Sequence, residues 1–305
     1  SNYINSKDNS EDVVIINMLA DITTNKTLSL DAADLEINLD GHTYTYTGNG
    51  DAISLESSSR QTMVNIYDDS KKGKLVASNG QAICANMNSD ITTSINIEAN
   101  TGIEGNIDSY IQVFGGTIKT TSTSIYLQDT ANLFTDNYKS DIIIESTEEN
   151  AIEVGNEHES AKSLDINNVK SITGKQYGIY ISAVDDTCNI NNSTIIGGGD
   201  TAQYSALYNE DNCVINISNS VLIGDLGCSS VIDNIGTMTI SGSDITTTGS
   251  VDGAIYNDEG TLDLTGCYIE DGIGAGIGNY GKCTIKSSTI IASDNTGIVN
   301  IYGNP

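Results

Sequence analysis

The chain has 305 residues, a net charge of −28 and only 13 basic residues. Nucleic acids and anionic membranes are bound by basic surfaces, so this charge argues against both as partners. No apolar run approaches the roughly 18 residues that indicate a membrane-spanning helix, and the sequence therefore predicts no direct membrane span.

The first 50 residues do not follow the pattern of the rest. Three stretches rich in apolar residues, at 13–19, 22–30 and 35–44, precede the first regular repeat. A stacked β-structure needs its open end covered, because the last strand otherwise presents unpaired backbone groups. We therefore expect residues 1–50 to form an N-terminal cap and first coil, and residues 51–305 to form a single continuous domain.

A short phrase recurs from residue 52 onward: a small residue, then Ile or Leu, then a variable residue, then an apolar residue or Asn. Its central residue returns every 20 to 30 positions, at Ile53, Ile83, Ile103, Ile125, Ile152, Ile179, Leu207, Ile232, Ile255, Ile277 and Ile298. Repeats of this length are typical of solenoids, in which each repeat buries its apolar side by stacking on its neighbours. The spacing predicts about 11 coils.

Each repeat carries three short strand signals. Residues 254–257, 261–265 and 267–269 alternate between apolar and polar positions and are separated by turns that contain Gly, Asp or Glu. This pattern is typical of half-buried strands. Apolar positions also align from coil to coil, as in Ile166, Ile190, Ile217, Ile240, Leu264 and Ile285. Three strands per coil, stacked about 4.8 Å apart, define an all-β parallel β-helix.

Two further columns are predicted to lie inside the stack. One consists of the asparagines that end five consecutive phrases, which can satisfy one another as a hydrogen-bonded ladder: Asn209, Asn234, Asn257, Asn279 and Asn300. The other places Cys188 and Cys283 in one apolar file, while Cys267 aligns with serines at a turn. The cysteines lack the close pairing of a zinc site, and we expect buried thiols.

The variable residue of each phrase faces outward and forms the candidate binding surface. In the middle of the chain this column is Tyr126, Glu153, Tyr180, Tyr208, Asp233 and Tyr256. Exposed aromatic rings stack on sugars and carboxylates accept hydrogen bonds from sugar hydroxyls, so the column is a candidate glycan-binding site. The alternative is that tyrosine merely suits an exposed strand and packs on its neighbours.

Acidic turns form a second candidate site. The pairs Asp185–Asp186, Glu210–Asp211 and Asp258–Glu259 each follow a phrase. Stacked carboxylates repel one another unless they are solvated or bridged, and Ca²⁺ prefers oxygen ligands of this kind. Solvated turns, a Ca²⁺ site and a carboxylate pair for sugar hydrolysis all remain open. No cofactor other than Ca²⁺ is expected, and no catalytic residue is assigned.

The phrase Ile37-Asn38-Leu39-Asp40-Gly41-His42-Thr43 resembles the first coil of pectin-lyase-like right-handed β-helices. The later Ala-Ile-Tyr-Asn and Gly-Thr-Leu-Asp-Leu-Thr-Gly phrases resemble the adhesin-like, surface-exposed bacterial members of that superfamily. The resemblance implies a right-handed single-stranded parallel β-helix. The Gly-His-Gly and Arg-x-Lys motifs of its polygalacturonase members are absent, and Arg60, the one arginine, lies in a polar loop.

The expected function is that of an extracellular protein, secreted or on the bacterial cell surface, which binds polysaccharide or host glycans along a lateral face. Targeting and anchoring signals are expected outside this sequence, since residues 1–12 are polar and acidic. The alternative is a carbohydrate-active enzyme, either a polysaccharide lyase or a glycoside hydrolase, that uses the acidic turns. Whether the protein is an enzyme is left open, with binding favoured over catalysis.

Overall fold

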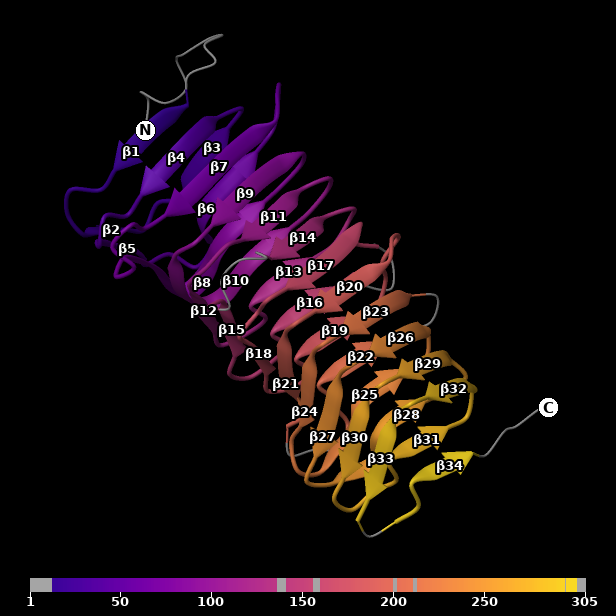
Figure 1. Ribbon diagram of the computed structural model, residues 1–305. Helices are drawn as coiled ribbons and strands as arrows, with labels where there is room; N and C mark the ends of the chain where they lie inside the picture. Colours follow the sequence, from indigo (N-terminus) through magenta and orange to yellow (C-terminus); the bar gives the residue numbers. More distant parts are fainter. Residues whose placement is uncertain are drawn as a thin grey trace.

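The computed structural model describes residues 13–135, 141–155, 160–199, 202–210, 213–293 and 295–300. Within these ranges the chain forms short strands joined by turns and contains no helix. The described residues consequently hold no helix that could cross a membrane. The strands stack in parallel into an elongated solenoid, with β1 near one end and β34 near the other (Figure 1).

The first ladder is a parallel sheet of 12 strands. Each strand pairs with its counterpart in the next coil, so the sheet extends along the solenoid axis. Its members are β1 (Val14–Asn17), β4 (Asp34–Asn38), β7 (Thr62–Tyr67), β9 (Ser89–Thr93), β11 (Tyr110–Val113), β14 (Asn132–Thr135), β17 (Ser163–Asn167), β20 (Cys188–Asn191), β23 (Val214–Ser218), β26 (Thr237–Ser241), β29 (Thr261–Thr265) and β32 (Lys282–Lys286).

The second ladder follows the first in every coil. Two long strands, β8 and β10, bend through this ladder and continue into the third. The members are β2 (Ile22–Thr24), β5 (Thr43–Tyr46), β8 (Lys74–Ala85), β10 (Asn96–Gly105), β12 (Thr117–Thr120), β15 (Ile143–Ser146), β18 (Ser171–Gly174), β21 (Thr194–Gly197), β24 (Val221–Gly224), β27 (Asp244–Thr247), β30 (Tyr268–Asp271) and β33 (Thr289–Ala292).

The third ladder contains the recurring Ile-centred phrase. Besides the far halves of β8 and β10, its members are β3 (Leu28–Asp31), β6 (Asp51–Glu56), β13 (Ile125–Leu127), β16 (Ile152–Val154), β19 (Ile179–Ile181), β22 (Leu207–Asn209), β25 (Cys228–Asn234), β28 (Ser250–Asn257), β31 (Ile277–Asn279) and β34 (Ile298–Asn300). The structure thereby confirms the all-β parallel solenoid with three strands per coil. The described part of residues 1–50 already pairs within the three ladders, and its role as a cap stays a prediction.

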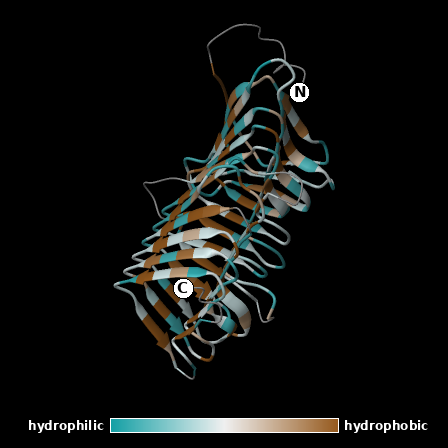
Figure 2. Ribbon diagram, turned by 90° about the vertical axis from the view of Figure 1, so that its right-hand side faces the viewer, coloured by the Kyte–Doolittle hydropathy of each residue, from teal (hydrophilic) through white to brown (hydrophobic). Residues whose placement is uncertain are grey.

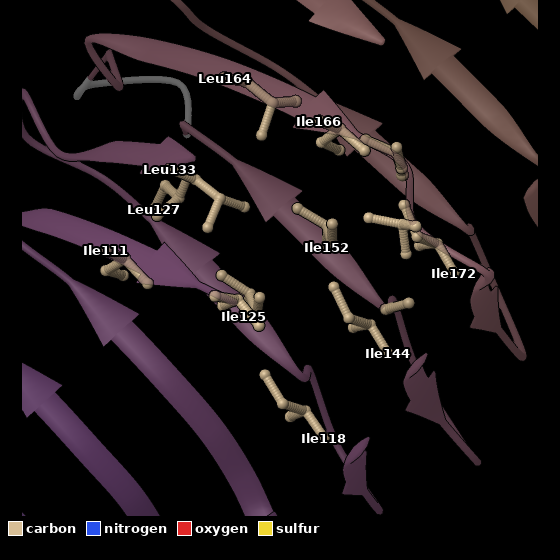
Figure 3. Packing of buried hydrophobic residues seen from close by; sticks show 14 of the residues in the cluster. Ile111, Ile118, Ile125, Leu127, Leu133, Ile144, Ile152, Leu164, Ile166 and Ile172 are labelled. Atoms are coloured by element: carbon tan, nitrogen blue, oxygen red, sulfur yellow. The ribbon is translucent and has the colours of Figure 1, made fainter. Parts of the chain in front are cut away.

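The core is a set of apolar files that run through the solenoid, one or more from each ladder. Figure 3 shows Ile111 and Leu133 from the first ladder, Ile118 and Ile144 from the second, and Ile125 from the third, among the packed side chains of this interior. The phrase centres pair in register from Ile53 to Ile298, as the spacing predicted. Apolar segments alternate with polar ones along the strands and turns (Figure 2).

The predicted polar ladders are also present. Each asparagine from Asn209 to Asn279 donates its side-chain amide to the next asparagine carbonyl at 2.7–2.8 Å. Cys267 takes the place of a serine in a second ladder, where its backbone N–H donates to Ser288 Oγ at 3.1 Å. Stacking allows these buried polar groups to satisfy one another, which a single buried asparagine could not do.

The connections between the first and second ladders determine where the surface is hollow. Several of them are tight turns around a residue with positive φ, such as Asn168, Asn192 and Asn219, at φ 57°, 48° and 49°. Asparagine tolerates this left-handed conformation better than most residues. The connection between β7 and β8, residues 68–73, is longer than its neighbours at 94–95 and 114–116.

Candidate functional site

The outward column of the third ladder is continuous through the middle of the molecule. Tyr126 pairs with Glu153, which pairs with Tyr180, which in turn pairs with Tyr208. Tyr208 pairs with Asp233, and Asp233 pairs with Tyr256. We call these six residues the tyrosine–acid strip. All six are half-buried, so one edge of each side chain reaches solvent.

Two tyrosines of the strip pack with two neighbouring tyrosines into a cluster of four rings. Tyr180 and Tyr208 stack with ring centroids 5.0 Å apart and an interplanar angle of 9°. Tyr177 lies against both rings, at 5.1 Å and 5.7 Å, and Tyr204 meets Tyr177 edge-on at 5.2 Å. Such arrangements are favoured by the ring quadrupoles. The cluster is therefore a rigid aromatic surface that needs little ordering when a ligand binds.

Hydrogen bonding and burial hold the cluster in place. The Tyr177 hydroxyl donates to the Gln203 carbonyl oxygen at 3.1 Å. Burial raises the pKa of Tyr177 to about 12, with smaller contributions from neighbours that include Tyr180 and Asp233. Burial also raises the pKa of Tyr208, and the charges of the nearby Glu210 and Asp233 carboxylates raise it as well. Both phenols thus stay neutral at physiological pH and keep their hydroxyl donors.

Carboxylates converge beside this ring cluster. Burial, with smaller contributions from the charges of Asp258, Asp252 and Glu210, raises the pKa of Asp233 from 3.8 to about 7. Asp252 also accepts a hydrogen bond from Ser229 Oγ at 3.0 Å. Asp233 can therefore act as a hydrogen-bond donor when protonated and as an acceptor when ionised. A carboxyl group of this kind can bind hydroxyl groups or exchange a proton near neutral pH.

Glu153 extends the same polar surface toward the N-terminal half. Its Oε2 accepts a hydrogen bond from Asn150 Nδ2 at 2.9 Å. Burial raises the pKa of Glu153; the Asn150 and Thr123 hydrogen bonds lower it, while the Glu149 charge raises it. Next to Tyr126, Glu104 accepts hydrogen bonds from Asn106 and Gln128 at 3.0 and 3.1 Å. The strip is thus lined by oriented amides and carboxylates.

The structure does not gather the acidic turns into one site. Asp186 Oδ2 forms an ion pair with Lys162 Nζ at 3.3 Å. Asp186 lies further along its turn, away from the end of the preceding strand. Glu210 and Asp258 each follow a strand directly and occupy equivalent positions two coils apart, with Ile235 between them. Asp185 and Glu259 lie in the same turns as these residues, and Asp211 lies outside the described residues.

No group of three or more His, Cys, Asp or Glu side chains in the described ranges has the arrangement of a metal site. Ca²⁺ binding by the acidic turns stays a prediction. The structure does bring Asp233 of the strip close to Glu210 and Asp258 of the turns. The charges of these two residues raise the pKa of Asp233.

Several residues of the site were missed by the sequence reasoning. Tyr177 and Tyr204 each come just before a phrase. Tyr280 comes directly after the phrase that ends at Asn279, and its ring contacts that of Tyr256, with centroids 5.3 Å apart. Tyr177 and Tyr204 precede the phrase centres Ile179 and Leu207 by two and three residues, so an alignment of the repeats does not place them in one column. A separate cleft that includes Tyr67 and Phe114 was also missed, because its walls come from connections of unequal length.

Neither the comparison with protein-family models nor the search of curated proteins gave a match for this chain. The pectin-lyase-like and adhesin-like resemblance therefore rests on the repeat phrases alone.

Proposed function

We propose that this β-solenoid is an adhesin-like protein that binds carbohydrate polymers along the tyrosine–acid strip. The observation that carries the proposal is the in-register column of aromatic rings and carboxylates on one ladder, reinforced by the packed rings of Tyr177 and Tyr204. Tyrosine rings offer flat faces and edges to sugar C–H groups, and the carboxylates accept hydrogen bonds from hydroxyls.

The strip favours a long ligand over a compact one. Its side chains repeat with each rung, about 4.8 Å apart, a spacing comparable to the length of one pyranose unit. A linear polymer that lies along the solenoid axis can therefore contact several rungs at once. Many weak contacts of this kind add up to useful affinity through their number.

Charge narrows the ligand class. Glu153 and Asp233 lie in the strip, Glu210 and Asp258 lie beside it, and the whole chain carries a net charge of −28. Acidic polysaccharides are repelled by such a surface unless a cation intervenes. We therefore propose a neutral polysaccharide or a host or cell-surface glycan as the ligand. A location outside the cell, secreted or surface-bound, belongs to this proposal and is supported by the resemblance of the repeat phrases.

The test compares two double variants on a glycan array and in titrations with the polymers that bind. Tyr180→Ala with Tyr208→Ala removes the stacked pair, and we expect about tenfold or greater loss of affinity, as for aromatic residues at the centre of an interface. Tyr110→Ala with Tyr268→Ala is the matched control, because it removes two half-buried tyrosines from the other two ladders. Equal binding by both variants, or no binding by the wild type, would reject the proposal.

A second candidate function is a carbohydrate-active enzyme, and the observation that favours it is the pKa of Asp233. A carboxyl group with a pKa of about 7 beside other carboxylates resembles the acid of a hydrolase pair. In that case Asp233 supplies the proton, and Glu210 or Asp258 acts as base or nucleophile. Release of reducing sugars by the wild type, lost in Asp233→Asn, would support this candidate over simple binding.

A further inference from the structure

A cleft lies where the first ladder connects to the second. The third ladder, which carries the recurring phrase, adjoins the opposite ends of the first ladder's strands. It has a volume of about 490 Å³, within the usual range for small-molecule sites. Tyr67, Ser94 and Phe114 are among its lining residues, with Asp69, Lys71, Asn96, Thr117 and Asp141 around them. None of these residues belongs to the tyrosine–acid strip.

In the cleft lining, one serine lies in register between two aromatic residues, and we call this position the notch. Ile66 of β7 and Val113 of β11 both pair with Thr93 of β9, so the residues that follow them, Tyr67, Ser94 and Phe114, share one column. The backbone N–H groups of Ser94 and Phe114 donate to the preceding rung at 3.0 and 2.8 Å, which continues the register. Ser94 is the short side chain between two large ones.

At the usual spacing of strands, the notch has room for one sugar ring. Tyr67 and Phe114 lie two rungs apart, which is about 10 Å at the usual spacing of strands. A ring held between two others needs van der Waals contacts of about 3.5–4 Å on each side. The gap above Ser94 therefore accepts a single ring, and Phe114 is supported from behind by an edge-on contact with Phe134, with centroids 6.2 Å apart.

The rim of the cleft is polar and is held in shape by buried bonds. The buried Asp68 accepts hydrogen bonds from the backbone N–H groups of Gly41, at 2.8 Å, and of Gly73, and these bonds lower its pKa against the opposing effect of burial. They fix the 68–73 connection as one wall. Lys71 and Asp141 pair across the cleft, with Nζ and Oδ2 3.6 Å apart, and Asn38 Nδ2 donates to Asp69 Oδ2 at 3.4 Å.

We propose that this cleft binds one or two units of a neutral saccharide, with a pyranose ring between Tyr67 and Phe114. The apolar C–H faces of the sugar contact the two rings, while its hydroxyl groups reach Asp69, Asp141 and Lys71 at the rim. A nucleotide has a ring of similar width, but its phosphates are repelled by the net charge of −28. A purely apolar ring makes no use of the polar rim, whereas the hydroxyl groups of a sugar can hydrogen-bond to it.

The experiment uses saturation-transfer NMR with the full chain and four probes: the methyl glycosides of β-glucose, β-galactose and α-mannose, and N-acetylglucosamine. Galacturonate and adenosine serve as anionic and aromatic comparisons. We expect at least one neutral probe to receive saturation from the wild type. Ser94→Phe fills the notch and should weaken that probe's binding about tenfold or more. Tyr67→Ala, which adds no volume, should also weaken it.

Thr92→Phe is the matched control, because it places the same ring on the outer side of the same strand, away from the cleft lining. We expect it to bind the probe like the wild type. The Tyr180→Ala and Tyr208→Ala double variant should also bind the probe like the wild type. The proposal for the cleft and the proposal for the strip can therefore be rejected independently of each other. Absence of binding by all four neutral probes, equal binding by Ser94→Phe, or adenosine binding that depends on Ser94 would overturn the proposal.

Discussion

At the scale of single residues, Asp233 is a carboxylate of the strip with a strongly raised pKa. It lies in the strip between Tyr208 and Tyr256, and its pKa is raised from 3.8 to about 7, first by burial and then by neighbouring carboxylates. A raised pKa means that the folded state holds this proton more tightly than the unfolded state does. The stabilisation is complete below pH 3.8 and is lost as pH rises through about 7.

Asp233→Asn removes this dependence, because the amide carries no charge at any of these pH values. We expect the variant to gain stability relative to the wild type as pH rises from 3.8 to above about 7, by about 1–3 kcal/mol once solvent screening is allowed for. Urea unfolding at a series of pH values, followed by circular dichroism, measures the difference. Two parallel curves for variant and wild type would contradict the assigned pKa.

At the scale of elements, the asparagine ladder joins five coils at the corner where the third ladder ends. Asn234 and Asn257 each donate to the next asparagine at 2.7 Å and also to a glycine carbonyl, that of Gly236 or Gly260, at 3.2 or 3.1 Å. The ladder starts at Asn209, whose Oδ1 is buried with no hydrogen-bond partner. This is the expected cost at the end of a ladder, since the preceding coil carries Ile181 at that position.

Interrupting the ladder in its middle should be costly. Asn257→Ala removes the acceptor of Asn234 and the donor to Asn279 and leaves buried groups unpaired. We expect the free energy of unfolding to fall by about 1–3 kcal/mol for each polar group left unsatisfied. Asn300→Ala is the control, because Asn300 is exposed and accepts one bond from Asn279. Equal losses in the two variants, measured by urea unfolding, would show that ladder continuity is unimportant.

At the scale of the whole molecule, the dominant feature is negative charge spread over an elongated surface. Ion pairs such as Lys74–Glu98, at 2.9 Å, and Lys119–Glu145, at 2.7 Å, join adjacent coils. With 41 acidic and 13 basic residues, most carboxylates have no basic residue to balance them. This repulsion disfavours association between solenoids and opposes the compact state.

Salt should therefore stabilise this protein. The Debye length falls from about 30 Å at 0.01 M to about 8 Å at 0.15 M ionic strength, which screens charges on neighbouring coils from one another. We expect Tm to rise by a few degrees over this range at neutral pH, as measured by scanning calorimetry. Near the isoelectric point of 4.1 the same change should have little effect, because the net charge vanishes there. A Tm independent of salt at neutral pH would contradict this account.

The alternation of residues and the period of the phrase were enough to predict the solenoid, the three ladders and the register of the strip. This succeeds because each coil repeats the same local pattern, and stacking identical patterns is the one arrangement that buries every apolar face. Ile179, Leu207 and Ile232 lie in one file for that reason. The asparagine ladder follows from the same argument.

The tertiary structure alone decided what lies beside the ladders. The rings of Tyr177 and Tyr204 meet Tyr180, Asp186 turns to Lys162, and the notch above Ser94 opens between connections of unequal length. The path of a connection depends on its length and on its neighbours in adjacent coils, which are far away in sequence. Strand register is a repeating local property that a sequence can reveal, whereas the meeting of turns is a non-local one that requires the folded chain.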